Sequence, residues 1–442
     1  MTSANRLLAL LWAIGLFFSQ TPVCAQPESR PPNVLLILSD DQAWTDYGFM
    51  GHPVIQTPNL DRLARESAVF SRGYVPTSLC RPSLASLITG VYPHQHQVTG
   101  NDPVSVAEAG KPKYQNADYL RLNKNLIERF QSQSRLPELL AQKGYVSFQS
   151  GKWWEGEFST GGFTNGMTYG DATRGGRHGD AGLKIGRDGL KPIYDFIESA
   201  GTKPWFVWYA PIMPHQPHNP PDRLLKKYQA GVMSVHVAKY YAMCEWFDET
   251  CGELLDHLKA TGMEENTLVF YVADNGWIQN PDQPRFDERS KRSPYDGGIR
   301  TPIMIRWPGH IAPEEYPDRL TSSLDFVPTV CVAAGVPIDE KLPGIDLLRV
   351  SNQNGISQRD TLFGEIFDHD LHDLDDPEKS LLFRWCIEGN WKLIQSHTDQ
   401  SLQLFDLAGD PHEKMNLAEQ HADVAKRLLA KIEAWYPAKE SR

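Results

Sequence analysis

Three continuous apolar runs, each followed by polar residues, dominate the hydrophobic pattern of the chain. They lie at residues 33–38, 205–209 and 268–273, and they show no alternation between apolar and polar side chains. A run of this kind is typical of a strand that is buried on both faces of a parallel sheet. The pattern therefore predicts an α/β protein with a large, mostly parallel central sheet.

Helical spacing of apolar residues appears between and after these predicted strands. Residues 57–70, 240–259 and 424–435 repeat apolar side chains at three- and four-residue intervals, which predicts helices with one buried face. Residues 101–134 and 156–190 lack such a pattern. We interpret both as loops, the first of them as an insertion at the mouth of a site, where long loops usually carry specificity.

The character of the chain changes near residue 336, where Pro, Asp and Gly become frequent and the predicted strands become shorter. We therefore place a domain boundary there. It separates a large α/β domain at residues 32–335 from a C-terminal α+β subdomain at residues 336–442, with a small sheet and a terminal helix.

The first 25 residues have the pattern of a secretory signal peptide. Arg6 precedes an apolar run at residues 7–18, and small residues stand at the cleavage position before Gln26. This run is shorter than the ~20 residues that span a bilayer comfortably. A lipid anchor on Cys24 is the alternative, which the two residues before it disfavour. We expect an exported protein, periplasmic or secreted, that is not inserted in a membrane.

The overall charge is negative, since 44 Lys and Arg residues face 55 Asp and Glu residues and give a net charge of -11. This balance argues against nucleic acid or an anionic membrane as the main partner. An anionic substrate would need a local positive site.

Loss of the leader leaves five cysteines, and an odd number in an exported chain indicates one unpaired thiol. Cys80 is the natural candidate. Cys244 and Cys251 lie seven residues apart in a predicted helix, about 10.5 Å by helical rise, which is too far for a disulfide. Cys331 and Cys386 could pair, and the sequence does not decide it.

Two pairs of oxygen-bearing side chains follow predicted strands. Asp40 and Asp41 come after the first apolar run, and Asp274 and Asn275 come after the third. An isolated Asp-Asp pair such as Asp40 and Asp41 is usually a solvated turn and helix cap, but open α/β sheets bind ligands at the carboxyl ends of their strands. If the two strands are neighbours, all four side chains can meet around one cation. Hard oxygen ligands favour Ca²⁺ or Mg²⁺ over zinc.

Cys80 begins the stretch Cys-Arg-Pro-Ser-Leu-Ala-Ser-Leu-Ile-Thr-Gly, which has the pattern of a helix start with Pro82 in the first turn. Free backbone N–H groups and the helix dipole favour an anion at such a position. An isolated cysteine before an apolar helix is more often a small buried hydrophobe.

This stretch resembles the signature of the formylglycine-dependent sulfatases of the alkaline phosphatase superfamily, Cys-x-Pro-Ser-Arg followed by an apolar stretch and Thr-Gly. The resemblance implies an alkaline phosphatase-like fold. It also implies that a formylglycine-generating enzyme oxidises Cys80 to an aldehyde whose hydrate is the nucleophile. Leu84 stands where the family has an arginine that aids maturation and holds the formylglycine. Arg81 is not an obvious replacement, because it would point elsewhere on a helix.

Further motifs of the family follow in the same order along the chain. Lys152 and Lys291 match lysines that bind the sulfate group, and Trp154 replaces a histidine next to the first of them. His215 matches the histidine that faces the scissile ester, and His218 is a further candidate for substrate contact. The resemblance gives the metal to Asp40 and Asp41 together with the second pair described above, and it makes His215 the candidate acid for the leaving group, with a pKa near neutrality.

The predicted function is therefore hydrolysis of sulfate monoesters by an exported sulfatase with a divalent metal. Trp44, Trp153, Trp154 and Trp277 flank the motifs and could stack sugar rings, which suggests a sulfated glycan, although large aromatic residues equally often line protein cores. A phosphate or phosphonate ester hydrolase of the same superfamily is one alternative. A catalytically impaired binding homologue, suggested by Leu84 and Trp154, is the other.

Overall fold

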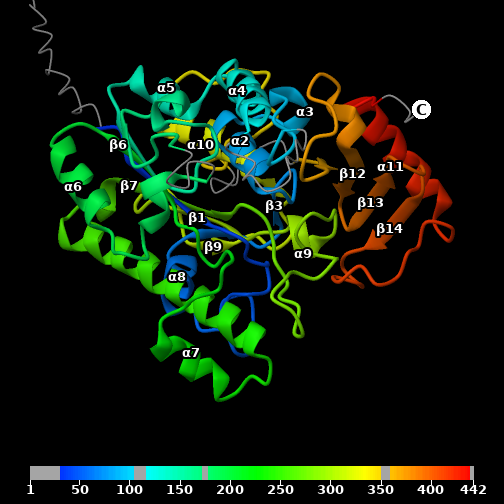
Figure 1. The fold of residues 1–442 in the computed structure, drawn as a ribbon, viewed down its shortest axis with the longest axis horizontal. Coiled ribbons are helices and arrows are strands. Elements are labelled where there is room, and N and C mark those ends of the chain that lie inside the picture. The colour runs from blue at the N-terminus through cyan, green and yellow to red at the C-terminus, as the bar shows by residue number, and fades with distance from the viewer. Residues whose placement is uncertain (1–29, 104–115, 172–177, 350–358, 439–442) are drawn as a thin grey trace, which may run out of the picture. The chain divides into compact units, whose positions relative to one another are not determined.

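The first apolar run forms the centre of the main sheet. β1 (Asn33–Ser39) pairs in parallel with β6 (Trp205–Ala210) on one side and with β7 (Thr267–Ala273) on the other. Every residue of these three strands is buried. The predicted mostly parallel sheet, with strands buried on both faces, is confirmed (Figure 1).

The computed structural model describes most of the chain, in residues 30–103, 116–171, 178–349 and 359–438. The predicted signal peptide lies outside these ranges. Residues Pro31–Arg442 form one compact unit.

The strands occur in two sheets and one short pair. The eight-stranded sheet has the order β5-β4-β6-β1-β7-β8-β2-β9, and a four-stranded sheet has the order β11-β12-β13-β14. The remaining bounds are β2 (Ala68–Phe70), β3 (Gly73–Tyr74), β4 (Val146–Gly151), β5 (Asn165–Gly166), β8 (Ile303–Arg306), β9 (Glu314–Glu315), β10 (Thr321–Ser322), β11 (Thr361–Phe367), β12 (Leu381–Glu388), β13 (Trp391–Ser396) and β14 (Leu402–Asp406).

Helices connect these strands along the chain. Their bounds are α1 (Pro58–Arg65), α2 (Cys80–Thr89), α3 (Pro93–His96), α4 (Ala117–Gln131), α5 (Leu136–Ala141), α6 (Lys191–Ala200), α7 (Asp222–Gln229), α8 (Val235–Ala260), α9 (Asp296–Ile299), α10 (Phe326–Ala333) and α11 (Ala422–Trp435).

Alternate residues of β1 face two different helical layers. Val34, Leu36 and Leu38 pack in one core with residues of α2, α5 and α10. Leu35 and Ile37 pack in the other core with residues of α1, α6 and α8. Burial on both faces explains why the strand sequence has no polar alternation.

The prediction of a loop across residues 101–134 is wrong for α4, and residues 104–115 of that stretch lie outside the described part. Asn116 begins the helix, because its side chain accepts hydrogen bonds from the N–H groups of Asp118 and Tyr119. Only three residues of α4 are buried, namely Tyr119, Leu126 and Phe130. This sparse apolar face is too weak to stand out from the sequence.

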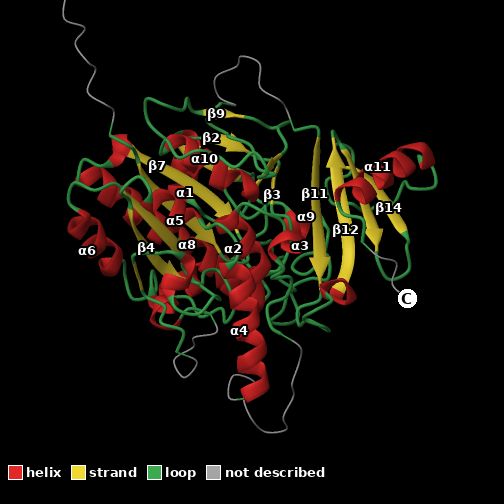
Figure 2. Ribbon diagram, turned by 90° about the horizontal axis from the view of Figure 1, so that it is seen from above, coloured by secondary structure: helices red, strands yellow, loops and turns green. Residues whose placement is uncertain are grey.

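The C-terminal part contains the small antiparallel sheet that the sequence predicts, with α11 packed against it (Figure 2). Leu428 and Ile432 of α11 share a core with Leu393 of β13. The opposite face of the sheet packs against the larger part of the chain, since Ile299 and Trp385 belong to one buried cluster. A domain boundary near residue 336 stays a prediction.

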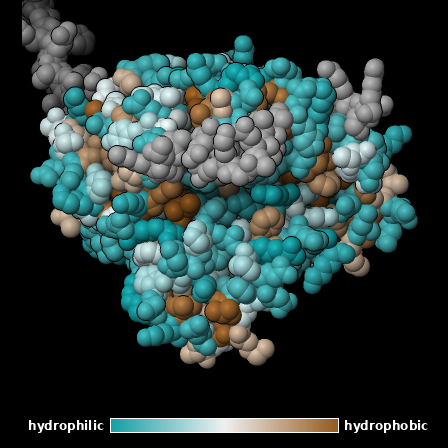
Figure 3. All heavy atoms as spheres, viewed as in Figure 1, coloured by the Kyte–Doolittle hydropathy of each residue, from teal (hydrophilic) through white to brown (hydrophobic). Residues whose placement is uncertain are grey.

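The five cysteines in the described part of the chain are all buried free thiols, including Cys331 and Cys386. Cys244 and Cys251 lie in the core face of α8, as predicted. The face seen in Figure 3 is covered mainly by hydrophilic residues, with hydrophobic ones in small groups. Within the described ranges, no helix has both the length and the apolar character that a membrane crossing requires.

Candidate active site

The two pairs of oxygen-bearing residues lie side by side at the carboxyl ends of neighbouring strands. Ser39 at the end of β1 pairs with Ala273 at the end of β7. The Asp41 N–H donates to Asp274 Oδ1 at 3.0 Å, and Asn275 Nδ2 donates to Asp41 Oδ1 at 2.6 Å. The structure thus brings Asp40, Asp41, Asp274 and Asn275 together, and all of them are at most 1% exposed.

Asp41 has a backbone φ of 64°, in the left-handed region that residues other than glycine rarely adopt. Such conformations persist where surrounding contacts hold them, and they are enriched at functional sites. Here the hydrogen bonds to Asp274 and Asn275 hold the residue, so the sharp turn after β1 directs its carboxylate into the cluster.

Two buried lysines face these carboxylates. Lys152 Nζ lies 2.5 Å from Asp40 Oδ1 and 3.1 Å from Asp274 Oδ2. Lys291 Nζ lies 2.7 Å from both carboxylate oxygens of Asp41. Lys152 directly follows β4, which is separated from β1 only by β6. Three ionised carboxylates therefore surround two ammonium groups, which leaves the cluster with an excess of negative charge.

The pKa values of the three carboxyl groups shift in different directions. Burial raises the pKa of both Asp40 and Asp274 to about 6, against the opposing effect of Lys152. Burial also acts to raise the pKa of Asp41, but Lys291 and His215 outweigh it and hold that pKa well below its usual value. Asp41 is the carboxylate that stays ionised most firmly.

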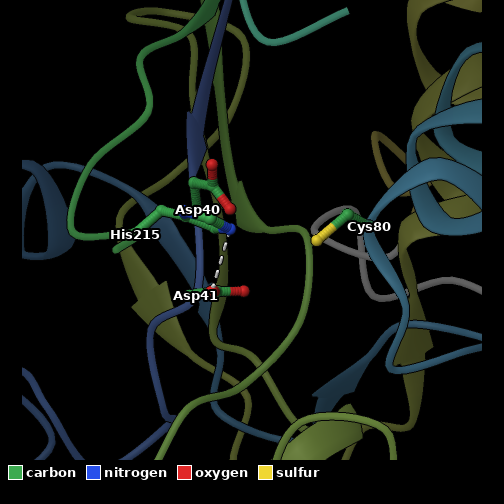
Figure 4. Close-up of side chains that lie close together, drawn as sticks. All are labelled: Asp40, Asp41, Cys80 and His215. Carbon is green, nitrogen blue, oxygen red and sulfur yellow. Dashed lines mark ion pairs between the residues drawn. The ribbon is translucent and has the colours of Figure 1, made fainter. Parts of the chain in front are cut away.

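Cys80 is the first residue of α2 and lies against this cluster (Figure 4). Its Sγ donates to Asn275 Oδ1 at 3.5 Å, and the side chain is 1% exposed. Ser83 Oγ on the same helix donates to the backbone oxygen of Asp274 at 2.6 Å, which holds the start of α2 against the turn that follows β7. Burial raises the pKa of the Cys80 thiol to about 11, so the unmodified thiol is neutral at physiological pH.

The residue that stands at the family's arginine position is buried in the core. Leu84 is 3% exposed and belongs to the apolar cluster around α2. Arg81 does not take over its place, as expected. It forms a two-pronged ion pair at 2.8 Å with Glu155 and donates to Asn123 Oδ1 at 2.8 Å. Arg81 therefore joins the start of α2 to the chain just after Lys152.

His215 follows β6 and reaches the cluster from the opposite side to Cys80 (Figure 4). Its Nε2 lies 3.5 Å from Asp41 Oδ2, and its Nδ1 lies 2.5 Å from the Gln216 carbonyl oxygen. Because a carbonyl only accepts, Nδ1 carries the proton in the neutral ring and Nε2 does not. Burial lowers the pKa of His215 to about 3, although Asp41 raises it. The expectation of a near-neutral pKa is thus wrong for this structure.

The tryptophans near the motifs are mostly buried. Trp153, Trp154 and Trp277 are at most 5% exposed, and the ring of Trp154 packs edge-on against His178 at 4.5 Å. Trp44 is half-buried, and the Arg300 guanidinium lies over its ring at 3.9 Å. Burial leaves Trp153, Trp154 and Trp277 without an open face for a sugar ring, whereas Trp44 lines a pocket with its ring covered on one face by Arg300.

Sequence reasoning missed the contacts that hold the lysine loop in place. The Arg292 N–H donates to the Ser78 carbonyl at 3.0 Å, and Ser78 Oγ donates to the Ser293 carbonyl at 2.7 Å. Ser78 lies two residues before Cys80, and this proximity in sequence is the one feature that could have indicated a role for Ser78 near the site. These bonds tie the segment that carries Lys291 to the segment that carries Cys80.

The residues present fit a divalent cation. Asp40 Oδ2 is buried and makes no hydrogen bond in the described part of the chain. The donor set of three carboxylates and one amide oxygen is of the hard type that Ca²⁺ and Mg²⁺ prefer. A divalent ion would also convert the excess negative charge of the cluster into an excess positive one.

Comparisons with known proteins identify the family. Residues 32–336 match the Sulfatase family model, and residues 285–436 match the model of the N-sulphoglucosamine sulphohydrolase C-terminal region. The chain belongs to the sulfatase family, whose characterised members hydrolyse sulfate esters. It is 30% identical to the N-acetylgalactosamine-6-sulfatase of Canis lupus familiaris over 392 residues, which covers 78% of this chain and 69% of that protein.

Solved structures share the fold. The crystal structure of Ps i-CgsB in complex with k-i-k-neocarrahexaose matches with a TM-score of 0.73 and 22% identity, covering 93% of this chain and 94% of that one. A phosphonate monoester hydrolase of Agrobacterium radiobacter matches with a TM-score of 0.67 and 20% identity, covering 92% and 95%. At these identities the likeness shows the alkaline phosphatase-like fold alone.

Proposed function

We propose that this chain is an exported sulfatase that removes a sulfate group from a carbohydrate ester, with a divalent metal and an oxidised Cys80. The observation that carries the proposal is the single buried cluster in which three carboxylates, an asparagine and two lysines meet beside the Cys80 thiol. Export rests on the leader pattern in the first 25 residues.

The metal, calcium or magnesium, would be held by Asp40, Asp41, Asp274 and Asn275. When bound, it supplies Lewis-acid stabilisation of negative charge and helps to activate the nucleophile. Lys152 and Lys291 already stand among these ligands as fixed positive charges. They would bind the sulfate oxygens, and such preorganised charges usually provide the largest part of the rate enhancement.

Oxidation of Cys80 to formylglycine would supply the nucleophile. The raised pKa of Cys80, about 11 because of burial, is consistent with this proposal, since it suppresses the thiolate that would otherwise be the nucleophile. A formylglycine-generating enzyme would act before folding, since Cys80 is 1% exposed in the folded chain.

His215 would donate a proton to the leaving oxygen of the sugar. With Nδ1 bonded to Gln216, its Nε2 carries a proton only when the ring is charged. A bound sulfate ester adds negative charge next to the ring and would raise its pKa toward the range useful for proton transfer. His218, three residues further on, would contact the sugar, and Trp154 would limit the size of the site from the Lys152 side.

A carbohydrate substrate is supported by the relatives. The dog relative is named for N-acetylgalactosamine 6-sulfate, and the structure of Ps i-CgsB contains a neocarrahexaose. A phosphate or phosphonate ester is the second candidate, because the Agrobacterium phosphonate monoester hydrolase shares the fold.

The test is hydrolysis of paired esters by the matured enzyme. We expect sulfate release from sulfated hexosamines and oligosaccharides, measured by ion chromatography, and much slower turnover of the matching phosphate esters and of an aryl sulfate. Faster turnover of the phosphate or phosphonate partner would favour the second candidate. Binding without turnover, with Cys80 still a thiol, would identify an impaired binding homologue.

A further inference from the structure

A cavity lies directly beside the loop that carries His215. It has a volume of about 540 Å³ and is lined by Gln216, Pro217, His218, His236, Lys239 and Pro284. This volume falls within the range of ordinary ligand pockets. The lining contains two imidazoles and one ammonium group, and none of its six residues is acidic.

The walls of this cavity are fixed at two points. The Gln216 side chain donates to the Pro284 carbonyl, and Ser234 Oγ donates to the Pro281 carbonyl. Ser234 also caps α8, because its Oγ accepts a hydrogen bond from the Val237 N–H at 3.3 Å. The loop at residues 281–284 is therefore pinned to both the His215 loop and the start of α8, so the cavity exists without a ligand.

The basic groups in the cavity lack partners. Within the described ranges, Lys239 and His236 make no hydrogen bond or ion pair, and both side chains are half-buried. His218 Nε2 is buried and has no hydrogen-bond partner in those ranges. The His218 ring packs against Tyr240 and Trp277, with centroids 5.3 and 5.6 Å away, which holds it at the cavity wall.

The Lys239 ammonium group has no acidic residue beside it in the cavity lining, and an anion bound there would stabilise its charge. Burial lowers the pKa of His218 to about 4, so its neutral ring contributes a hydrogen-bonding nitrogen to the wall rather than a second positive charge. A buried nitrogen without a partner likewise costs free energy that a ligand oxygen can recover. Both observations indicate a ligand with negatively charged oxygens. Gln216, Pro217 and His218 in the cavity lining directly follow His215 of the proposed catalytic site along the chain.

We propose that this cavity, here called the Lys239 pocket, binds a second anionic group of the glycan whose sulfate ester is hydrolysed. The group is a sulfate or a uronate carboxylate on the leaving-group side of the scissile bond. The inference rests on the proposed function and narrows it, because it makes the substrate a polyanionic glycan rather than a sugar with a single sulfate.

Binding to unmatured protein tests the pocket without turnover. The full chain would be produced without a maturing enzyme, so that Cys80 stays a thiol, and titrated calorimetrically in the presence of Ca²⁺. The probes are a hexosamine 6-sulfate, the same sugar with a second sulfate, and a disaccharide that joins the 6-sulfated hexosamine to a uronate. We expect at least one doubly charged probe to bind tenfold or more tightly than the hexosamine 6-sulfate, and its identity assigns the anion.

Substitutions in the pocket separate its contribution from that of the catalytic cluster. Lys239→Met should remove about tenfold of affinity for the preferred doubly charged probe and less than twofold for the hexosamine 6-sulfate, and Lys239→Arg should restore most of it. His236→Gln should give a smaller loss of the same kind. Lys259→Met, at the exposed far end of the same helix, is the matched control and should change neither affinity.

The outcomes distinguish the pocket from the proposed function. Equal affinity of the wild-type protein for all three probes, or equal losses for all probes in Lys239→Met, would overturn the pocket and leave the sulfatase proposal intact. No binding of any sulfated sugar would overturn both. Heat denaturation of each variant by circular dichroism checks that the compared proteins are folded.

Discussion

Two buried groups of lysines and carboxylates serve different purposes in this molecule. The first, called the catalytic cluster because we propose that catalysis takes place there, consists of Asp40, Asp41, Asp274, Lys152 and Lys291. The C-terminal cluster consists of Asp296, Glu413, Arg300 and Lys392. In the second, Lys392 Nζ lies 2.8 Å from Asp296 Oδ1 and 2.7 Å from Glu413 Oε1, and Arg300 lies 3.6 Å from Asp296.

The difference lies in charge balance. Two carboxylates face two cations in the C-terminal cluster, which joins α9 to β13. Glu413 Oε1 makes no hydrogen bond in the described part of the chain but lies in an ion pair with Lys392 Nζ, so both carboxylates have a cation beside them. Three carboxylates face two cations in the catalytic cluster, and Asp40 Oδ2 has no hydrogen-bond partner in the described part of the chain. Burying charge costs several kcal/mol per ion unless it is paired. The excess of carboxylates over cations therefore supports the proposal that the catalytic cluster binds a metal ion.

The largest expected effect is that of Asp274→Asn. Removal of one of the three carboxylates should abolish measurable Ca²⁺ binding in calorimetry and lower turnover by more than the ~100-fold typical of changes outside the ligand shell. The metal-free protein should be no less stable, because its excess negative charge is gone. Asp296→Asn is the matched control in the C-terminal cluster, and it should lower stability while leaving Ca²⁺ affinity within twofold. The reverse pattern would contradict the comparison.

Lys392→Met should destabilise the protein by about 3–5 kcal/mol, because it leaves Asp296 and Glu413 buried without their shared cation. Urea unfolding followed by fluorescence measures this loss. Neutralising all three residues, with Lys392→Met, Asp296→Asn and Glu413→Gln together, should recover most of it. A loss below about 1 kcal/mol for the single variant would show that Lys392 does not stabilise the protein as a buried ion-pair partner.

Cation affinity should fall in acid. Burial raises the pKa of Asp40 and Asp274 to about 6, so each takes up a proton below that pH, and this proton must leave before the metal binds. Because Asp40 and Asp274 titrate as a pair around Lys152, calorimetry should show Ca²⁺ affinity at pH 5 at least about tenfold weaker than at pH 8. An affinity that is flat over this range would place the metal elsewhere.

The same shifts have the opposite effect on the stability of the metal-free protein. Because the folded-state pKa values lie above the usual 3.8, the contribution of Asp40 and Asp274 to stability is fully present below pH 3.8. It is lost as the pH rises through about 6. Added Ca²⁺ should remove this loss, and urea unfolding with and without the ion between pH 4 and 8 measures both effects.

The smallest expected effect is that of Lys431→Met. This variant tests whether the contribution of the C-terminal cluster to stability depends on burial. Lys431 pairs with Glu388 in the same subdomain, but its side chain is 36% exposed. Exposed pairs contribute about 0–1 kcal/mol, and urea unfolding should show a loss in that range. A loss equal to that of Lys392→Met would mean that the subdomain is sensitive to any lysine change.

The sequence predicted those features of the site that depend on which residues directly follow a buried strand. Asp40 and Asp274 end fully apolar runs, and parallel pairing of β1 with β7 brings such ends together. Contacts between residues that are distant along the chain could not be predicted from the sequence. Asp296 and Lys392 lie 96 residues apart, and no local pattern tells that a lysine in β13 is buried.

Other misses have similar causes. The apolar face of α4 is carried by three residues, which is too few to show a period. The near-neutral pKa expected for His215 ignored its burial, which only the folded chain reveals. The Lys239 pocket needs α8 to meet the loop at residues 281–284, a contact between segments that have no common motif.

The most direct test is mass spectrometry of the tryptic peptide that contains Cys80, after expression with a formylglycine-generating enzyme. The account predicts an aldehyde in place of the thiol, in proportion to the sulfate released by the same preparation. Expression of the same chain without the formylglycine-generating enzyme is the control and should leave the thiol unchanged. Undiminished sulfatase turnover by protein in which Cys80 remains entirely a thiol would contradict the account.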